Sequence, residues 1–202
     1  KTLLDSDVTS KGKNDFVTVV DKLCEEKLVT VLAKLLPESG FIAEEGTSTK
    51  KGEVYNWIID PIDGTTNFMH GAPPFSISIA LQENNEIVIG VILEMFSKEC
   101  FYSWKGGEVY VNDSVVNCSK GKQLSGALIA TGFPYKAFDR LENFMASLIF
   151  FMEESHGVRR LGSAAMDLAY VAAGRYDAFY EYNLNAWDVA AGAFLVKQSG
   201  GV

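Results

Sequence analysis

The sequence predicts a layered structure of helices and strands in two halves, an α+β half over residues 1–120 and an α/β half over residues 121–202. In the first half, apolar runs of strand length follow one another with short turn sequences between them, which is typical of antiparallel sheet. In the second half, such runs alternate with stretches of helical spacing. With 202 residues, 48% of them hydrophobic, the chain can bury a large core. We expect the two halves to share one continuous interface.

The first half begins with a polar stretch at residues 10–14, which predicts a hairpin tip or loop. An amphipathic helix is predicted over residues 21–35, ending near Pro37, because apolar residues recur there at three- and four-residue spacing. Those residues are Leu23, Cys24, Leu28, Val31, Leu32 and Leu35. Strands are then predicted at residues 40–43, 54–59, 76–82, 87–95, 99–104, 109–111 and 115–118, the third and fourth forming a long hairpin.

The second half predicts alternating elements after about Gln123. The expected strands cover residues 127–131, 158–161 and 177–182, and the expected helices cover residues 138–154, 163–173 and 187–198. Gly174 follows the second of these helices at the position where a left-handed residue commonly ends a helix.

The charge balance limits the possible partners. Eighteen Lys and Arg against 26 Asp and Glu give a formal charge of −8, which disfavours binding to nucleic acid or to an anionic membrane. No apolar run is long enough to span a bilayer, and residues 1–10 lack the apolar segment of a signal peptide. Cys24, Cys100 and Cys118 form no CxxC pair. We therefore expect reduced thiols in a soluble, cytoplasmic protein.

The sharpest chemical feature is a pair of carboxylates, Asp60 and Asp63, at the end of a predicted buried strand. Two such groups do not easily stay ionised together without a positive charge, and no Lys or Arg lies between Glu53 and Glu94. Mg²⁺ or Mn²⁺ would supply that charge. The alternative is a capped turn at Asp63-Gly64 with solvated aspartates.

The segment after this pair predicts a helix start that could bind phosphate. Thr65, Thr66 and Asn67 could cap a helix start with hydroxyl and amide groups, and the backbone amides at such a start suit a phosphate.

Other acids follow predicted strands or open helices. Glu44 and Glu45 end one strand, Glu181 ends another, and Asp188 opens an apolar helix. Taken singly, Glu44 and Glu45 are better explained as an exposed acidic turn, and Asp188 as an N-cap aspartate. The alternative for Glu181 is a solvent-facing side chain.

Residues 159–165 combine Arg159 and Arg160 with Gly162, Ser163 and Ala164 at a helix start, where small residues let a ligand approach the unpaired amides. An ordinary tight helix entry with solvated arginines is the alternative. His70 and His156 are too few and too isolated for a zinc site or a Ser-His-Asp triad, and we expect them at the surface. No P-loop or GxGxxG sequence is present.

Taken together, these pieces resemble the inositol monophosphatase family of Mg²⁺-dependent, lithium-sensitive phosphatases. The matching segments are residues 15–21, 41–45, 60–68, 160–165 and 187–192. The resemblance runs from about Lys11 to Val202, and it implies an αβαβα layered sandwich of the sugar-phosphatase type. Residues 131–135 and the Arg159-Arg160 pair are similar to the inositol phosphatase branch of that family.

The resemblance also implies roles for individual residues. Two or three Mg²⁺ ions, or Mn²⁺, would be held by Glu44, Asp60, the Ile62 carbonyl, Asp63 and Asp188. The catalytic residues would be Thr65 and Glu44, which position the attacking water, and Asp21, which orients Thr65. The substrate would be contacted by Asp63, Gly64, Thr65, Gly162, Ser163, Ala164, Glu181 and Asp188.

The resemblance implies hydrolysis of a small polyol phosphate, with inositol monophosphate as the first candidate, and a homodimer. Fructose 1,6-bisphosphate, 3′-phosphoadenosine 5′-phosphate and histidinol phosphate are the alternatives within the family. A non-catalytic metal-binding interaction module on the same fold is the rival from another class. Family members usually have one more helix before the Asp15 region and further strands and helices after Val202, so both ends would be truncated.

Overall fold

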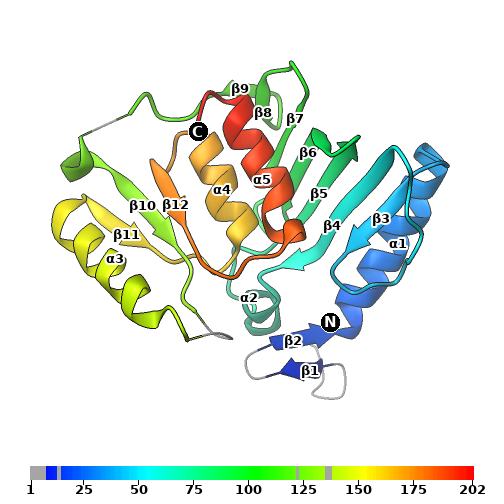
Figure 1. Cartoon of the computed structure of the whole chain (residues 1–202), viewed down its shortest axis with the longest axis horizontal. Helices are drawn as coiled ribbons and strands as arrows, with labels where there is room; N and C mark the ends of the chain where they lie inside the picture. The colour runs from blue at the N-terminus through cyan, green and yellow to red at the C-terminus, as the bar shows by residue number, and fades with distance from the viewer. Residues whose placement is uncertain (1–7, 13–14, 122, 135–137) are drawn as a thin grey trace.

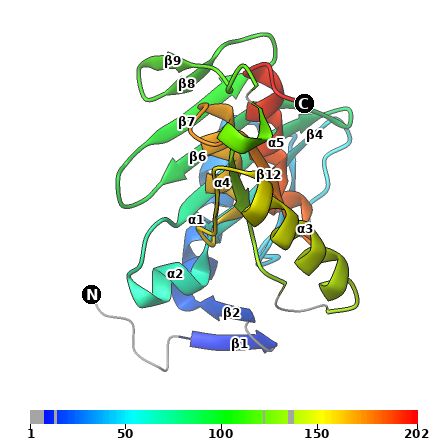
Figure 2. The ribbon, with the colours of Figure 1, turned by 90° about the vertical axis from the view of Figure 1, so that its left-hand side faces the viewer.

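Five layers of alternating helices and sheets make up the computed structural model, which describes residues 8–12, 15–121, 123–134 and 138–202, with side chains from residue 19 onward. A seven-stranded sheet has α1 (Val19–Leu35) on one face and α5 (Ala186–Gln198) on the other. Next to α5 lies α4 (Ala164–Ala172), which also contacts a three-stranded sheet, and α3 (Leu141–Glu154) packs against the far side of that sheet (Figures 1 and 2). This order is the predicted αβαβα sandwich.

The large sheet has its strands in sequence order, β3-β4-β5-β6-β7-β8-β9. Only the first pair is parallel, and the other neighbours are antiparallel, as predicted for this half. The strands are β3 (Gly40–Ala43), β4 (Tyr55–Asp63), β5 (Ser76–Glu83), β6 (Glu86–Glu94), β7 (Cys100–Trp104), β8 (Val109–Val111) and β9 (Ser114–Val116). A short helix, α2 (Thr65–His70), lies between β4 and β5.

The small sheet is parallel, in the order β11-β10-β12. Its strands are β10 (Leu128–Thr131), β11 (Gly157–Arg159) and β12 (Ala178–Tyr180), and a 3₁₀ turn at Leu124–Gly126 precedes the first. Gly174, at φ 67°, follows α4 as predicted. A separate hairpin pairs β1 (Val8–Gly12) with β2 (Asp15–Thr18). Of the tip or loop expected at residues 10–14, residues 10–12 belong to β1, and residues 13–14 lie outside the described residues.

The two faces of β4 bury different sets of side chains. Trp57 and Ile59 pack with the α1 side, whereas Ile58 belongs to the core beneath α4 and α5. Because side chains alternate along a strand, Asp60 follows Ile58 onto the face covered by α5. The alternation therefore carries an acid into the interior between the two sheets.

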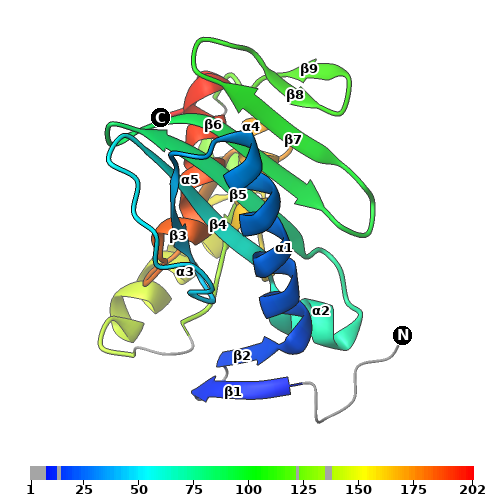
Figure 3. The ribbon, with the colours of Figure 1, turned by 90° about the vertical axis from the view of Figure 1, so that its right-hand side faces the viewer.

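The predicted apolar face of the first helix is partly wrong. In α1, which crosses the outer face of the large sheet (Figure 3), Leu23, Val31 and Leu35 are exposed. The buried residues are Leu32 and two acids, Asp21 and Glu25. Helical spacing identified the helix, but hydrogen-bonding partners that are distant in sequence determine which side faces inward.

One hydrophobic core draws on both parts of the chain. It includes Phe101 and Val109 from the large sheet together with Ala165 and Leu195 from the helices α4 and α5. The boundary proposed near residue 120 stays a prediction. None of the described helices is long and apolar enough to cross a membrane.

A close approach between β6 and α5 depends on Gly90. A Cβ atom at this position would lie 3.0 Å from the Ala191 carbonyl oxygen and 2.9 Å from the Phe194 ring. A side chain there would push the helix away from the sheet. Gly90 thus helps to set the position of the helix that carries Asp188.

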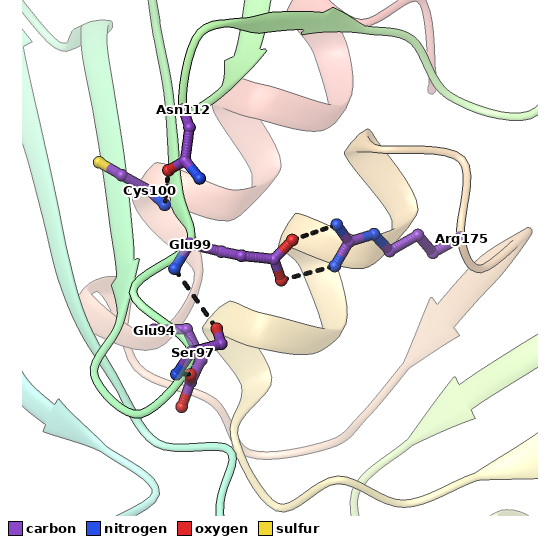
Figure 4. A network of polar contacts seen from close by, with 6 residues as sticks. All are labelled: Glu94, Ser97, Glu99, Cys100, Asn112 and Arg175. Carbon is purple, nitrogen blue, oxygen red and sulfur yellow. Dashed lines mark hydrogen bonds and ion pairs between the residues drawn. The ribbon is translucent and has the colours of Figure 1, made fainter.

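An ion pair joins the large sheet to the end of α4. Figure 4 shows the Arg175 guanidinium facing both oxygens of Glu99, and the Nη1–Oε2 distance is 2.8 Å. The same guanidinium lies 4.8 Å from the ring centroid of Tyr170 and 5.4 Å from that of Phe101. These contacts fix the turn between α4 and β12 against β7.

Replacing Arg175 by Met should lower the free energy of unfolding by about 1 kcal/mol, because it removes a two-point ion pair and two ring contacts while keeping an apolar stem. Urea denaturation measures this change. Lys105→Met is the matched control, since it removes the same charge from the fully exposed Lys105–Glu86 pair and should have little effect. Equal losses in both variants would contradict this account of the junction.

Candidate active site

One cavity of about 330 Å³ collects most of the predicted site residues. Its walls come from the turn after β3, the end of β4, the start of α2, the segment before α4, and the residues around β12 and α5. The lining residues are Glu44, Asp60, Ile62, Asp63, Gly64, Thr65, Thr66, Asn67, Gly132, Arg160, Gly162, Ala164, Glu181, Leu184 and Asp188. Segments more than 100 residues apart in sequence therefore meet at one place.

The two aspartates of the strongest motif are buried. Asp60 is 2% exposed and Asp63 is 9% exposed, so the alternative of solvated aspartates is wrong. The strand β4 also runs further than predicted, to Asp63, and its register against β5 shifts between these two residues. Pro61 has no N–H for the ladder, which explains why the pairing is interrupted there.

Asp63 is held by the N-terminus of α4. Its Oδ2 accepts a hydrogen bond from the Ser163 hydroxyl at 2.5 Å and from the Ala165 N–H at 2.7 Å. Helix N-termini favour negative charge, so these donors stabilise the ionised carboxylate. Ser163 thus acts on Asp63 and does not itself line the cavity.

Burial and mutual repulsion raise the pKa values of the buried pair. Burial is the largest cause of the raised pKa of Asp60, which lies well above its ordinary range. Nearby carboxylates add to that effect, namely Glu44, Asp63 and Asp188. Burial also raises the pKa of Asp63 to about 6, although the bonds from Ser163 and Ala165 act in the opposite direction. The site therefore favours either a proton or a cation at these oxygens.

Thr65 does not cap its helix. Its hydroxyl lies 3.1 Å from Oδ1 of Asp21 and 3.0 Å from the Ile62 carbonyl oxygen, and Asp21 is only 1% exposed. The capping position of α2 is occupied by Gly64, in a left-handed conformation and without a side-chain cap bond. The predicted pairing of Asp21 with Thr65 is present in the structure.

The Asn67 side chain forms other hydrogen bonds than the predicted helix cap. Its amide donates to the carbonyl oxygens of Pro74 and Leu161, each at 2.8 Å. This side chain ties α2 to the segment that precedes α4, and both segments line the cavity. Neither long-range partner could be identified from local sequence.

Glu44 and Asp188 bring two further carboxylates to the cavity. The Glu44 N–H donates to the Ile59 carbonyl oxygen at 3.2 Å, which fixes the turn after β3 beside β4. Asp188 is the third residue of α5, and its Oδ2 accepts from the Asn185 N–H at 2.6 Å. The alternative of Asp188 as the N-cap residue is therefore wrong, because Asn185 holds that position.

Glu181 faces the other side of the cavity beside Gly132 and Arg160. Burial, supported by repulsion from Asp63, raises the pKa of Glu181 to about 7, and Arg160 acts in the opposite direction. A Cβ atom on Gly132 would lie 2.0 Å from the Glu181 carboxylate. Glycine at that position lets this carboxylate approach the backbone closely, and the half-buried Glu181 lines the cavity.

Some sequence expectations outside the cavity are also settled. His70 and His156 are exposed, as predicted. Cys24, Cys100 and Cys118 form no disulfide in the structure. Residues 135–137 lie outside the described residues. The similarity of residues 131–135 to the inositol phosphatase branch therefore stays a prediction.

The donor set suits a hard divalent cation, since every candidate ligand is an oxygen. The structure supplies carboxylates from Glu44, Asp60, Asp63 and Asp188, and the Ile62 carbonyl beside them. Among the residues that the structure describes, no three His, Cys, Asp or Glu side chains are arranged so that they could hold a metal ion. The fit therefore rests on the shared cavity and on the buried charge, and the ligand set itself is a proposal.

This chain is similar in sequence to one protein family and to several known proteins. The profile of the inositol monophosphatase family matches residues 1–202. The chain is 42% identical over 195 residues to the inositol-1-monophosphatase of Rhizobium meliloti, which covers 96% of this chain and 73% of that protein. It is also 42% identical over 200 residues to the Nus factor SuhB of Pseudomonas aeruginosa, covering 96% and 74%.

A solved structure shows the same arrangement. The extragenic suppressor protein suhB from Bartonella henselae superposes with a TM-score of 0.91 at 40% identity, covering 96% of this chain and 74% of that one. The names of these similar proteins differ in kind, since one describes a phosphatase and others a Nus factor or a suppressor. These names do not agree on one activity.

Asp167, on α4, is an acid that sequence reasoning missed. It is 1% exposed, and neither of its carboxylate oxygens has a hydrogen-bond partner among the described residues. Burial raises its pKa to about 8, and the negative charges of Asp63 and Glu181 add to this effect against the attraction of Arg160. Tyr176 is a further titratable neighbour, and Asp167 contributes to the raised pKa of its hydroxyl. The only sequence signal was a charged residue on an otherwise apolar helix.

Replacing Asp167 by Asn should therefore stabilise the protein at high pH. Folding raises the pKa of Asp167 from an ordinary value near 4 to about 8. Between these pH values the unfolded chain has released this proton and the folded protein has not, so the parent protein loses stability as the pH rises. Asn has no proton to lose, so the variant lacks this dependence. At pH 9 the variant should be more stable than the parent by an amount on the order of a few kcal/mol, with a smaller difference at pH 5.

Denaturant unfolding of metal-free protein at both pH values measures this difference. Asp63 and Glu181 are present in both proteins, so the comparison of variant with parent isolates the titration of Asp167 together with its coupling to these two acids. A difference that is independent of pH would show that Asp167 stays ionised in the folded protein, and it would contradict the account.

Proposed function

Because this chain belongs to the inositol monophosphatase family, we propose that it is a Mg²⁺-dependent phosphomonoesterase whose substrate is a small polyol phosphate, with inositol monophosphate as the first candidate. The observation that carries the proposal is the convergence of five carboxylates on one cavity, two of them buried. Such a site binds an anionic phosphate only when cations reverse its field. A phosphatase of a metal-dependent family accounts for that arrangement.

The proposed ligands divide between the two sides of the cavity. Asp60, Asp63 and the Ile62 carbonyl come from the end of β4, and Glu44 comes from the adjacent turn. Asp188 reaches the cavity from α5. Following the family, Asp188 would hold a second ion, and Asp63 would contribute to both. Divalent cations, when bound in such a cage, lower the pKa of a coordinated water and neutralise charge on the phosphoryl oxygens.

The protein positions the attacking water through Thr65 and Glu44. The Thr65 hydroxyl directs its proton toward Asp21 and the Ile62 carbonyl. Its remaining lone pairs can then accept a hydrogen bond from the water, which aligns that water with the phosphorus. Asp21 is the positioning residue in this scheme, because it sets the orientation of the hydroxyl.

Substrate binding uses the start of two helices. The backbone amides of Gly64 and Thr65 suit the phosphate group. Gly162 and Ala164 approach the polyol closely because they carry little side chain, and Glu181 accepts hydrogen bonds from its hydroxyls. Arg160 lines the same side of the cavity, where its charge favours an anionic substrate.

Other substrates of the family remain candidates under the same chemistry, namely fructose 1,6-bisphosphate, 3′-phosphoadenosine 5′-phosphate and histidinol phosphate. Lithium sensitivity, a homodimer and a cytoplasmic location are likewise proposals that follow the family. Since several similar proteins are named as Nus factors, the expectation of no nucleic-acid partner also stays a prediction. A non-catalytic module is disfavoured because Glu44, Thr65 and Asp188 are all present at the cavity.

Phosphate release from a panel of substrates tests the proposed activity. With Mg²⁺ present, we expect inositol 1-phosphate to give the highest kcat/KM among the candidates, and chelation of the metal should stop release. Preference for phosphoadenosine phosphate or fructose bisphosphate would move the chain to another branch of the family. The absence of phosphate release from every substrate would support the non-catalytic alternative.

Asp63→Asn should abolish turnover, with a loss of kcat of about 10²-fold or more, because it removes one negative charge from the centre of the cage. The fold should survive, since an Asn carbonyl oxygen can still accept from the Ala165 N–H. Asp113→Asn removes the same charge from an exposed turn and should leave kcat unchanged. Substantial activity in the Asp63 variant, at equal folded fraction by circular dichroism, would count against the assignment.

A further inference from the structure

The first two turns of α1 contact three segments that line the cavity. Asp21 accepts from Thr65, as described above. The Cys24 thiol donates to the Pro61 carbonyl oxygen at 3.6 Å, and Glu25 accepts from the turn after Glu44. Positions 21, 24 and 25 share one face of the helix because they are three and four residues apart. This face of α1 therefore supports the cavity wall from behind.

Glu25 accepts three hydrogen bonds from the turn after Glu44. It is completely buried, with 0% exposure. Its Oε2 accepts from the Glu45 N–H at 2.7 Å, and its Oε1 accepts from both the N–H and the hydroxyl of Thr47 at 2.8 Å. Three donors of one turn, 20 to 22 residues away in sequence, therefore bind a single carboxylate.

The geometry of the turn explains why a carboxylate suits this position. Gly46 lies between the two donating residues at φ 65°, and a left-handed residue at that position lets neighbouring N–H groups point to the same side. A carboxylate has two oxygens with several lone pairs, so it can accept all three hydrogen bonds together. An apolar side chain would leave both amides without this partner.

The two bonds that flank Glu44 fix its backbone from both sides. The N–H of Glu44 itself donates to Ile59 in β4. The N–H of the next residue, Glu45, donates to Glu25. The peptide before Glu44 is thus tied to the sheet and the peptide after it to the helix, and the direction of the Glu44 side chain follows from this backbone.

We propose that Glu25 is a positioning residue that holds Glu44 at the cavity. The inference rests on the proposed function, since it concerns the metal ligand and water-positioning group assigned to Glu44. Glu25 does not line the cavity, and it acts through the turn at residues 44–47. Its loss should weaken metal binding before it affects substrate binding.

Glu25→Gln is the direct test, with Glu26→Gln as the matched control. A glutamine keeps the size of the side chain but places an NH₂ group against a donor, either the Glu45 N–H or the Thr47 N–H. Glu26 is the next residue of the same helix and is exposed, so its variant removes the same charge without touching the turn. Thr47→Val, which removes only the hydroxyl bond, is a milder variant should Glu25→Gln fold poorly.

Mn²⁺ binding without substrate, followed by electron paramagnetic resonance of the free ion, gives a readout independent of turnover. We expect Glu25→Gln to raise the Kd for Mn²⁺ and the half-saturating Mg²⁺ concentration by about tenfold or more, with KM for substrate nearly unchanged at saturating Mg²⁺. Thr47→Val should show a smaller shift in the same direction. Glu26→Gln should behave as the parent protein.

A purely structural role would give a different result. Glu25→Gln would then lower the unfolding temperature while its folded fraction bound Mn²⁺ with the parent's affinity, and this outcome overturns the inference. If the parent protein neither binds Mn²⁺ nor releases phosphate, the proposed function fails and this inference fails with it. Normal behaviour of the parent together with a normal Glu25 variant rejects the positioning role alone.

Discussion

Mutual repulsion of buried carboxylates is the constraint on which this structure depends. Asp60 and Asp63 are enclosed at the end of β4, and Glu44 and Asp188 face the same cavity. Left to local preferences, these groups would move apart or into solvent, because burial without compensation disfavours their charge. The surrounding fold must therefore hold them together, and a bound cation would turn that repulsion into attraction.

The fold meets this demand with hydrogen-bond donors and rigid supports from both parts of the chain. The N-terminus of α4 supplies two donors to Asp63, and α1 holds Thr65 through Asp21. Asn67 connects the start of α2 to the segment before α4. The large sheet carries one side of the cavity and the central helices carry the other, so the site exists only when the shared core is formed.

Sequence patterns predicted the helices, the strands and the acidic site residues better than they predicted which way the side chains point. Strand-length runs and helical spacing located almost every element, whereas the strand predicted at residues 54–59 extends to Asp63 as β4. Asp60 and Asp63 stood out because two acids follow an apolar strand with no nearby basic residue. Their burial could not be derived locally, since it depends on a helix about 100 residues later.

The residues that sequence reasoning missed act over long distances. Glu25 was not singled out by any sequence pattern, although it lies four residues after Asp21 and therefore on the same face of the helix. Asp167 is enclosed by segments that no local pattern connects. No sequence pattern marked Gly132, because its role is to leave space for the Glu181 carboxylate.

The most direct test of the central claim is a crystal structure of the protein with Mn²⁺, examined by anomalous scattering. The account predicts anomalous peaks inside the cavity within coordination distance of oxygens of Asp60, Asp63, Glu44 and Asp188. Peaks elsewhere on the surface, with these carboxylates turned away from one another around an ion-free cavity, would contradict it.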